Sequence, residues 1–146
     1  MTITIAKMDI SHTKEVASIE ANTFSEPWSL KAFEDAVTSK DYIYIVALDN
    51  EKVVGYAGSV MSMGEADITN IAVCNEYRRM GIGNELLCQL VTQLKNCSVE
   101  KVFLEVRESN NSARMLYSSN GFIEIGMRKN FYRKPDENAI LMELTI

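Results

Sequence analysis

Asn70-Ile-Ala-Val-Cys-Asn-Glu-Tyr-Arg-Arg-Met-Gly-Ile-Gly83 is the stretch that decides the fold, because an apolar run leads through a basic, glycine-containing loop into an amphipathic segment. Apolar residues then recur at helical spacing, namely Ile82, Leu86, Leu87, Leu90, Val91 and Leu94. The spacing predicts a helix that begins at 81–83, with its unpaired N–H groups facing the loop. Glycines let the backbone approach a ligand closely, and the helix dipole favours an anion at that end. The stretch therefore predicts a pyrophosphate site.

The loop differs from two common phosphate-binding patterns. A Walker A loop needs a Lys-Ser or Lys-Thr pair after its last glycine, and a dinucleotide fingerprint needs a third glycine. Asn84 and Glu85 follow Gly83 instead. Arg78 and Arg79 add positive charge in front of the predicted helix. These residues indicate a phosphate ligand that is neither a nucleoside triphosphate nor a dinucleotide.

Composition predicts one globular domain that spans residues 1–146. The chain is 47% hydrophobic and 24% charged, which is ordinary for a soluble protein with a substantial core. Its N-terminus lacks a charged start followed by a long apolar core, and no stretch reaches membrane-spanning length. We therefore expect a cytoplasmic protein with no membrane partner. A net charge of −5 disfavours direct nucleic-acid binding and suits a cationic acceptor.

The three cysteines, Cys74, Cys88 and Cys97, are expected to be reduced thiols. Their number is odd and their spacing fits no zinc motif, so no metal site is expected. Cys88 is expected to pack in the core, because free cysteine behaves as a small buried hydrophobe. The single histidine, His12, is expected at a helix cap, which leaves no positioned thiol–imidazole pair for covalent catalysis.

The order of predicted elements favours an α/β fold in which a mixed central sheet has helices on both faces. The first two helices are expected to begin at the N-caps Ser11 and Ser29. A later helix at 111–120 is expected to end at Gly121. Six strands are expected, at 42–48, 53–61, 66–73, 101–106, 122–127 and 139–145. Polar turns separate the first three of them, which indicates an antiparallel meander.

Glu105 is a carboxylate in the otherwise apolar strand at 101–106, where it shares a face with Phe103. In a sheet covered on both sides this position is partly desolvated. Desolvation raises a carboxyl pKa and makes the group a better base near neutral pH. An ion pair with Arg107 or Arg128 that holds the strand ends is the alternative, and the residues alone leave both open.

The loop Arg78-Arg79-Met80-Gly81-Ile82-Gly83 resembles the signature of the GNAT superfamily of acetyl-CoA-dependent N-acetyltransferases, which is Gln or Arg, two residues, Gly, one residue, then Gly or Ala. The predicted element order is similar to the mostly antiparallel GNAT fold, in which the strands before and after the cofactor loop and helix splay apart. Cys74-Asn75 departs from the Asp-Pro of many members and makes the loop entry less rigid. The resemblance implies that acetyl-CoA, without a metal, contacts Ile71, Ala72, Val73, Arg78, Arg79, Met80, Gly81, Ile82, Gly83, Asn84, Asn110 and Tyr117.

The stretch from Glu105 to Phe122 resembles the bacterial ribosomal-protein alanine N-acetyltransferases, the RimI type. Their proton acceptor and proton donor correspond to Glu105 and Tyr117, with the twelve-residue interval kept. Asn110 corresponds to their cofactor contact. Without the resemblance, Tyr117 forms a helical stripe with Ala113 and would be interpreted as a core aromatic.

Two further segments resemble the acceptor region of that subfamily. Phe24-Ser-Glu-Pro-Trp-Ser29 is similar to its Phe-Pro-Trp-Ser segment, and Arg128-Lys-Asn-Phe-Tyr132 to its Arg-Arg-Asn-Tyr-Tyr segment. The resemblance implies that Trp28, Glu105 and Tyr132 contact the acceptor. Structural alternatives stay open: Trp28 as a staple at a helix start, and Tyr132 as a loop aromatic with a solvent-facing hydroxyl.

The resemblance implies direct transfer of acetyl, in a ternary complex, to the α-amine of a protein N-terminus, that of a ribosomal-protein alanine. Glu105, directly or through water, would take the amine proton, backbone N–H groups at 71–73 would hold the thioester carbonyl, and Tyr117 would protonate the thiolate. Acetylation of a small amine, such as a polyamine or an antibiotic, is the alternative within enzymes. A catalytically idle CoA-binding module is a second alternative, which the presence of both Glu105 and Tyr117 disfavours. The acceptor's identity and the oligomeric state stay open.

Overall fold

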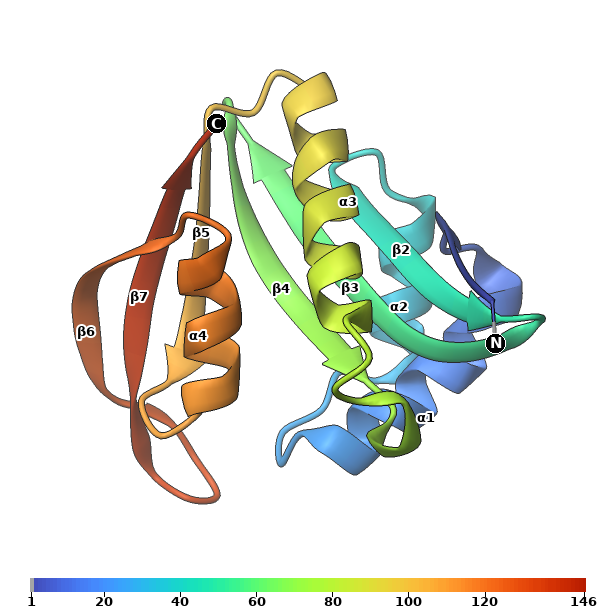
Figure 1. Cartoon of the computed structure of the whole chain (residues 1–146), viewed down its shortest axis with the longest axis horizontal. Coiled ribbons are helices and arrows are strands. Elements are labelled where there is room, and N and C mark those ends of the chain that lie inside the picture. The colour runs from blue at the N-terminus through green and yellow to red at the C-terminus, as the bar shows by residue number, and fades with distance from the viewer. Residues whose placement is uncertain (1) are drawn as a thin grey trace.

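The computed structural model describes residues 2–146 and contains one seven-stranded sheet in the order β1-β2-β3-β4-β5-β7-β6 (Figure 1). The strands are β1 (Ile3–Lys7), β2 (Tyr42–Asp49), β3 (Lys52–Ser62), β4 (Glu65–Val73), β5 (Lys101–Arg107), β6 (Ile123–Tyr132) and β7 (Glu137–Thr145). The helices are α1 (Thr13–Thr23), α2 (Leu30–Thr38), α3 (Ile82–Asn96) and α4 (Asn111–Ser119), with 3-10 turns η1 (Ile10–His12) and η2 (Asn75–Tyr77). Within the described residues, no helix combines the length and the apolar character that crossing a membrane requires.

The sheet is mixed and mostly antiparallel, as predicted. Strands β2, β3 and β4 form the expected meander, and only the β4–β5 pair is parallel. That pair is short, since it extends only from Glu65 opposite Lys101 to Asp67 opposite Phe103. Beyond Asp67 the two strands separate, which gives the V shape in the centre of Figure 1. The splay implied by the family resemblance is therefore confirmed.

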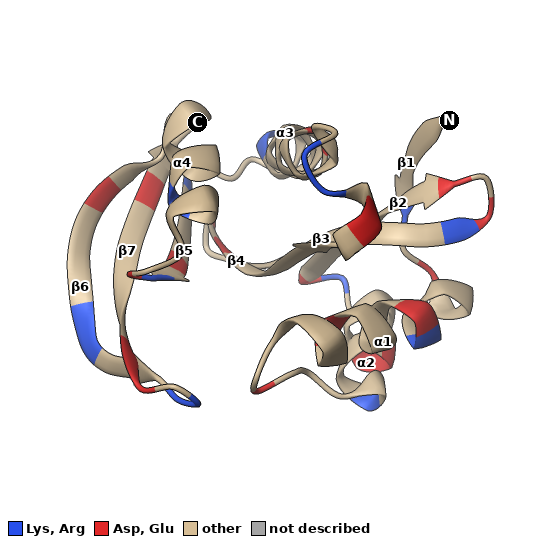
Figure 2. Cartoon of the chain, turned by 60° about the horizontal axis from the view of Figure 1, so that its bottom comes forward, with Lys and Arg blue, Asp and Glu red and all other residues tan. Residues whose placement is uncertain are grey.

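Each face of the sheet has its own hydrophobic core. Helices α3 and α4 cover one face, and α1 and α2 cover the other (Figure 2). Successive residues of a strand point to opposite faces, so Ile45 joins the α3 core while Val46 joins the α1–α2 core. The apolar stripe predicted for α3 is buried, and each fully buried leucine in it contributes roughly 1.5–3 kcal/mol of transfer free energy. These leucines are Leu86, Leu87, Leu90 and Leu94.

Strand β1 was not predicted from the sequence. Its alternation of Ile3, Thr4 and Ile5 is typical of a strand, but the segment was considered only as a possible leader. In the structure β1 pairs antiparallel with β2, with Ile5 opposite Ala47. Ile3 and Ile5 pack against the α3 core. The sheet therefore has one more strand than expected, at the edge far from the gap between β4 and β5.

Two smaller expectations are wrong and one is confirmed. Ser11 does not cap α1, because it lies inside η1, where Asp9 accepts its N–H at 2.8 Å; His12 is the N-cap residue of α1. Cys88 is exposed rather than buried. It lies about 100° around the helix from its neighbour in the buried stripe, on the solvent side of α3. Ser29 caps α2 as expected, since its hydroxyl accepts the N–H of Ala32 at 3.1 Å.

Candidate active site

The N-terminus of α3 presents backbone N–H groups that have no partner within residues 2–146. Gly81 is the N-cap residue and has a left-handed φ of 81°, with no side-chain capping bond. The first intrahelical bond runs from the N–H of Glu85 to the carbonyl of Gly81 at 3.0 Å. The N–H groups of Ile82, Gly83 and Asn84 precede that bond and stay free, as the first turn of a helix leaves them. Such a turn is suited to an anion.

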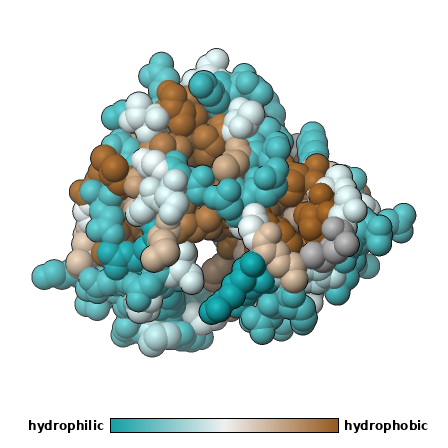
Figure 3. Space-filling view, viewed as in Figure 1, coloured by the Kyte–Doolittle hydropathy of each residue, from teal (hydrophilic) through white to brown (hydrophobic). Residues whose placement is uncertain are grey.

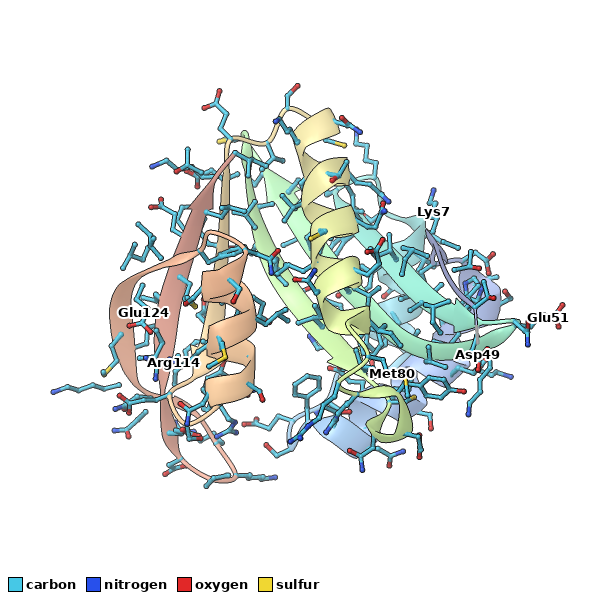
Figure 4. All side chains as sticks on the ribbon, viewed as in Figure 1. Lys7, Asp49, Glu51, Met80, Arg114 and Glu124 are labelled. Atoms are coloured by element: carbon cyan, nitrogen blue, oxygen red, sulfur yellow. The ribbon has the colours of Figure 1, made fainter. Side chains whose placement is uncertain are left out.

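The loop before α3 places two arginines beside this turn. The Nε of Arg78 donates to the carbonyl of Val73 at 3.0 Å, which ties the loop to the end of β4. Arg79 has a left-handed φ of 63°. Met80 is exposed in this loop, below the first turn of α3 in the view of Figure 4. Neither arginine forms an ion pair with another described residue, so both charges can neutralise a phosphate group.

Strand β4 has a bulge close to the point where it leaves β5. Gly58 of β3 pairs with Asn70, and Ser59 pairs with Ile68, so Thr69 is an extra residue on β4. A bulge of this kind bends a strand and redirects its groups. The bulge therefore sets how the last part of β4 faces the gap.

The backbone of β4 beyond the bulge directs alternate N–H groups into the gap. The N–H of Cys74 donates to the carbonyl of Val54 on β3 at 2.8 Å. Because N–H groups alternate between the two edges of a strand, Ala72 also donates toward β3. Ile71 and Val73 then direct their N–H groups to the opposite edge, where β5 has moved away. Of the three residues expected to hold a thioester carbonyl, two have N–H groups with the required direction.

A buried carboxylate lies beneath the bulge on the α1–α2 face. Glu20 accepts the hydroxyl of Tyr56 at 2.5 Å, the side-chain amide of Asn70 at 3.0 Å and the backbone N–H of Trp28 at 2.9 Å. A carboxylate can be buried at tolerable cost only where donors satisfy it in this way. Glu20 thereby joins α1, β3, the bulge of β4 and the segment before α2.

Glu105 lies half-buried on β5, on the face opposite Leu104, which packs in the α3 core. The two arginines considered as its ion-pair partners are engaged elsewhere. Arg107 pairs with Glu137 at 3.2 Å, and Arg128 lies 5.8 Å from the ring centre of Phe131. In the described chain no Lys or Arg nitrogen lies within 4.0 Å of the Glu105 carboxylate. The ion-pair interpretation is therefore wrong.

Tyr132 is the last residue of β6, and the guanidinium carbon of Arg107, two residues after Glu105 on β5, lies 4.6 Å from the centre of its ring. Burial raises the pKa of Tyr132 to about 12, and the negative charge of Glu105 adds to the rise. Burial likewise raises the pKa of Tyr117 well above its usual range, with a smaller contribution from Tyr132. Such charge effects require proximity, so Tyr132 lies near Glu105 and near Tyr117. Tyr132 lies in a strand rather than in a loop, and a solvent-facing position of its hydroxyl stays open, because that hydroxyl makes no hydrogen bond within the described chain.

Tyr117 combines core packing with a reachable hydroxyl. Its ring is 6% exposed and packs edge-on against Phe122, with centroids 5.8 Å apart. Its hydroxyl makes no hydrogen bond to the rest of the described chain, yet no fully buried polar side-chain atom there lacks a partner. The hydroxyl therefore reaches accessible space. Figure 3 shows an opening between the half of the molecule that carries α4 and the half that carries α3.

The two asparagines expected at the cofactor have structural contacts of their own. Asn110 caps α4, because its Oδ1 accepts the N–H of Ala113 at 3.2 Å. Asn84 accepts the side-chain amide of Asn120 at 2.8 Å and so joins the start of α3 to the end of α4. The backbone N–H of Asn84 is left for a ligand, and the side-chain amide nitrogen of Asn110 makes no bond within residues 2–146.

Trp28 is a hydrophobic staple at the start of α2. It immediately precedes the N-cap Ser29, and its ring lies 5.4 Å from that of Phe33 in the first turns of the helix. A second contact, at 5.9 Å, joins it to Tyr44. This packing is the arrangement that orients the chain entering a helix. The structural interpretation of Trp28 is confirmed, and its contact with an acceptor stays a prediction.

Sequence reasoning missed Glu20 and the contacts of Arg107. Glu20 follows Val16 by four residues, so helical spacing places this carboxylate on the buried face of α1, a signal that was available. Arg107 was considered only as a partner of Glu105. Two of its four hydrogen-bond partners are backbone carbonyls, and a backbone carbonyl has no sequence signature.

Comparison with known proteins agrees with this geometry. The model of the acetyltransferase (GNAT) family matches residues 13–122. The chain belongs to the GNAT acetyltransferase family. The recognition made from the Arg78–Gly83 loop is thereby confirmed, and the chain is an acyl-transferring enzyme of this family.

Several relatives of this GNAT enzyme are similar over nearly their whole length. The ribosomal protein bS18-alanine N-acetyltransferase of Haemophilus influenzae is 36% identical over 141 residues, which cover 94% of this chain and 95% of the relative. A putative enzyme of the same name from Bacillus subtilis is 35% identical over 139 residues, covering 94% and 90%.

Solved structures agree on the fold. The crystal structure of the ribosomal-protein-S18-alanine N-acetyltransferase from Escherichia coli has a TM-score of 0.92 and 34% identity, covering 99% of this chain and 94% of that one. Arabidopsis thaliana NAA60 in complex with a bisubstrate analogue has the same TM-score at 20% identity, covering 99% and 98%. The second similarity shows the fold alone.

Proposed function

We propose that this GNAT enzyme transfers the acetyl group of acetyl-CoA to the N-terminal α-amine of a ribosomal protein, that of the alanine of bS18. One observation carries the proposal: β4 and β5 separate beyond Asp67, and Glu105 lies half-buried on β5 beyond that point, across from the part of β4 that directs free N–H groups into the gap. Relatives at 34–36% identity that are named for this reaction support the choice of acceptor.

Acetyl-CoA would be held on the α3 side of the sheet. The free N–H groups of the first turn of α3, with Arg78 and Arg79, fit the pyrophosphate in charge and in donor number. Asn110 would donate its free amide hydrogens to the pantetheine arm. The N–H groups of Ile71 and Val73 would hold the thioester carbonyl at the gap. Together these donors would hold the cofactor from its pyrophosphate to its thioester.

The acceptor would enter from the opposite face, where Glu105, Tyr132 and the segment before α2 lie. Glu105 takes a proton from the ammonium, because a protonated amine cannot attack. The N–H groups of Ile71 and Val73 stabilise the negative charge that develops on the carbonyl oxygen. Tyr117 gives its proton to the CoA thiolate as the C–S bond breaks and the N–C bond forms. The raised pKa of Tyr117 keeps that proton in place until the transfer.

The test is incubation of the protein with acetyl-CoA and a peptide that copies the N-terminus of bS18, followed by tandem mass spectrometry. Acetyl is expected on the α-amine of the first alanine and on no internal lysine. The same peptide with a blocked α-amine is the control, and it should stay unmodified. Spermidine offered in place of the peptide tests the small-amine alternative. Thiol release with spermidine but not with the peptide would reject the proposal.

Gly83→Val tests the cofactor path. A Cβ at Gly83 would lie 3.6 Å from Leu116 and 3.9 Å from Val73, between α4 and the end of β4. Valine fits there without backbone strain but fills the path between the helix start and the gap. Loss of hydrogen bonds to an anion costs about 1.5–3 kcal/mol, so the CoA dissociation constant should rise roughly tenfold or more in titration calorimetry.

Gly126→Val is the matched control. Gly126 lies on the edge strand β6, away from α3, and a Cβ there would make one ordinary contact, with Leu141 of β7 at 3.5 Å. It should bind CoA with wild-type affinity. Valine is also a better helix former than glycine, so Gly83→Val should not lower the melting temperature. Equal CoA affinities in the two variants would remove Gly83 from the cofactor path.

A further inference from the structure

Arg107, the last residue of β5, makes four hydrogen bonds that the chemistry at the gap does not require. Its Nη1 donates to the carbonyl of Pro135 at 2.9 Å and to the carboxylate of Glu137 at 3.2 Å. Its Nη2 donates to the carbonyl of Arg133 at 2.7 Å and to the hydroxyl of Ser25 at 3.4 Å. The side chain is 25% exposed, so these bonds form in partly desolvated surroundings.

These bonds join two connecting segments that are distant in sequence. Residues 24–29 connect α1 to α2, and residues 133–136 connect β6 to β7. Ser25 also donates directly to the carbonyl of Arg133 at 3.2 Å. Figure 2 shows both segments in the lower part of the view, on the side of the sheet that carries α1 and α2. Arg107 therefore clamps together the two segments that border the acceptor face.

The same guanidinium orients Tyr132. Its central carbon lies 4.6 Å from the centre of the Tyr132 ring, a stacking distance for arginine on an aromatic face. Glu137 is fixed in turn, because its second oxygen accepts the N–H of Ser109 at 2.6 Å. The ring of Tyr132 is thus held by Arg107. Arg107 is itself fixed by Glu137 on β7 and by the connecting segments 24–29 and 133–136.

We propose that Arg107 is the positioning residue for acceptor selection: it keeps residues 24–29 and 133–136 at a fixed separation and so sets the width of the channel in which an extended peptide N-terminus lies. The inference rests on the proposed function, because it takes a peptide as the acceptor. The role of Arg107 requires a side chain with several N–H donors in one plane. Lysine carries the same charge at one point, and it cannot reach carbonyls on both sides while stacking on a ring.

The test compares Arg107→Lys and Arg107→Gln with wild type on the Ala-starting peptide. Both variants lose hydrogen bonds that the charged guanidinium makes to the two segments. We expect the peptide KM to rise roughly tenfold or more in each, because the segments no longer keep their separation. The KM for acetyl-CoA should not change, because no cofactor group is touched. If Arg107→Lys restores the wild-type peptide KM, charge alone suffices and the proposal is wrong. A parallel rise in both KM values would also overturn it, since it would indicate a general loss of structure.

Arg114→Gln is the matched control. Arg114 on α4 pairs with Glu124 on β6 at 2.5 Å and donates to the carbonyl of Glu108 at 2.8 Å, away from both acceptor segments (Figure 4). Its side chain is 28% exposed, close to the value for Arg107. This variant loses a comparable bridge between elements, yet its peptide KM should stay at the wild-type value.

Amide hydrogen exchange gives a measurement that needs no acceptor. Faster exchange at residues 24–29 and 133–137 is expected in Arg107→Gln and not in Arg114→Gln, because only the first releases these segments. Unchanged exchange in Arg107→Gln would show that no clamp exists. If wild type acetylates no Ala-starting peptide, the proposed function fails, and the exchange result then decides by itself whether Arg107 holds the two segments.

Discussion

Tyr117→Phe is expected to lower kcat by roughly 10²–10⁴-fold, the usual contribution of a general acid. The substitution keeps the ring that packs on Phe122 and removes only the hydroxyl, which has no partner in the described chain. Folding and CoA affinity should therefore stay at wild-type values. Thiol release on an Ala-starting peptide gives kcat, and titration calorimetry gives the CoA affinity.

Tyr42→Phe is the control for Tyr117→Phe. Tyr42 lies in the aromatic cluster on the α1–α2 face, 6.4 Å from the ring of Trp28. Its hydroxyl has no bond to lose within residues 2–146, and its variant should turn over like wild type. Wild-type turnover in Tyr117→Phe as well would leave Tyr117 with core packing as its only role.

The raised pKa of Tyr117 gives the same prediction a pH dependence. A tyrosine acts as an acid only while protonated, and burial moves its loss of the proton to higher pH than the usual value of about 10. Wild-type kcat should therefore not fall between about pH 7 and 9 through this group. A decline in that range would have to come from another residue.

Local patterns predicted the parts of the fold that depend on neighbouring residues. The apolar stripe of α3 has helical spacing, and the meander of β2, β3 and β4 has apolar runs separated by polar turns, so both were correct. The buried position of Cys88 was wrong because residue type was given more weight than its angle on the helix. Strand β1 was missed although its alternation is regular.

Features that depend on pairing between distant strands had no such pattern. The splay of β4 from β5 was expected only through the family resemblance, and nothing in the composition marks Thr69 as a bulge. The position of Glu105 on an apolar strand was a usable signal. The absence of an ion pair at Glu105 could not be predicted, because Arg107 contacts chain segments that only the fold brings together.

Glu105→Gln is expected to lower kcat/KM on the Ala-starting peptide by roughly 10²–10⁴-fold near pH 7, where a base is needed to free the amine. An α-amine has a pKa of about 7.7–8.0, so most of it is unprotonated by about pH 9. The free-amine fraction rises roughly six- to tenfold between these pH values, so the variant should recover part of its lost rate, by up to about that factor. The measurement is kcat/KM against pH for both proteins.

Glu143→Gln is the matched control. Glu143 on β7 is also a partly exposed carboxylate on a strand, but it pairs at 3.3 Å with Lys101, which begins β5 at the end away from the gap. Its pH profile should follow wild type. A full rate for Glu105→Gln at pH 7 would show that Glu105 is not the base.

The same base explains why an α-amine is the expected acceptor. A lysine amine has a pKa of about 10.4, roughly 2.5 units higher, so its deprotonation costs about 3.4 kcal/mol more. A half-exposed carboxylate such as Glu105 is suited to the smaller of these costs. Raising the pH should therefore increase the rate of Glu105→Gln on the α-amine well before any internal lysine is modified. Acetyl found on an internal lysine while the α-amine stays free would contradict both the acceptor and this account of its selection.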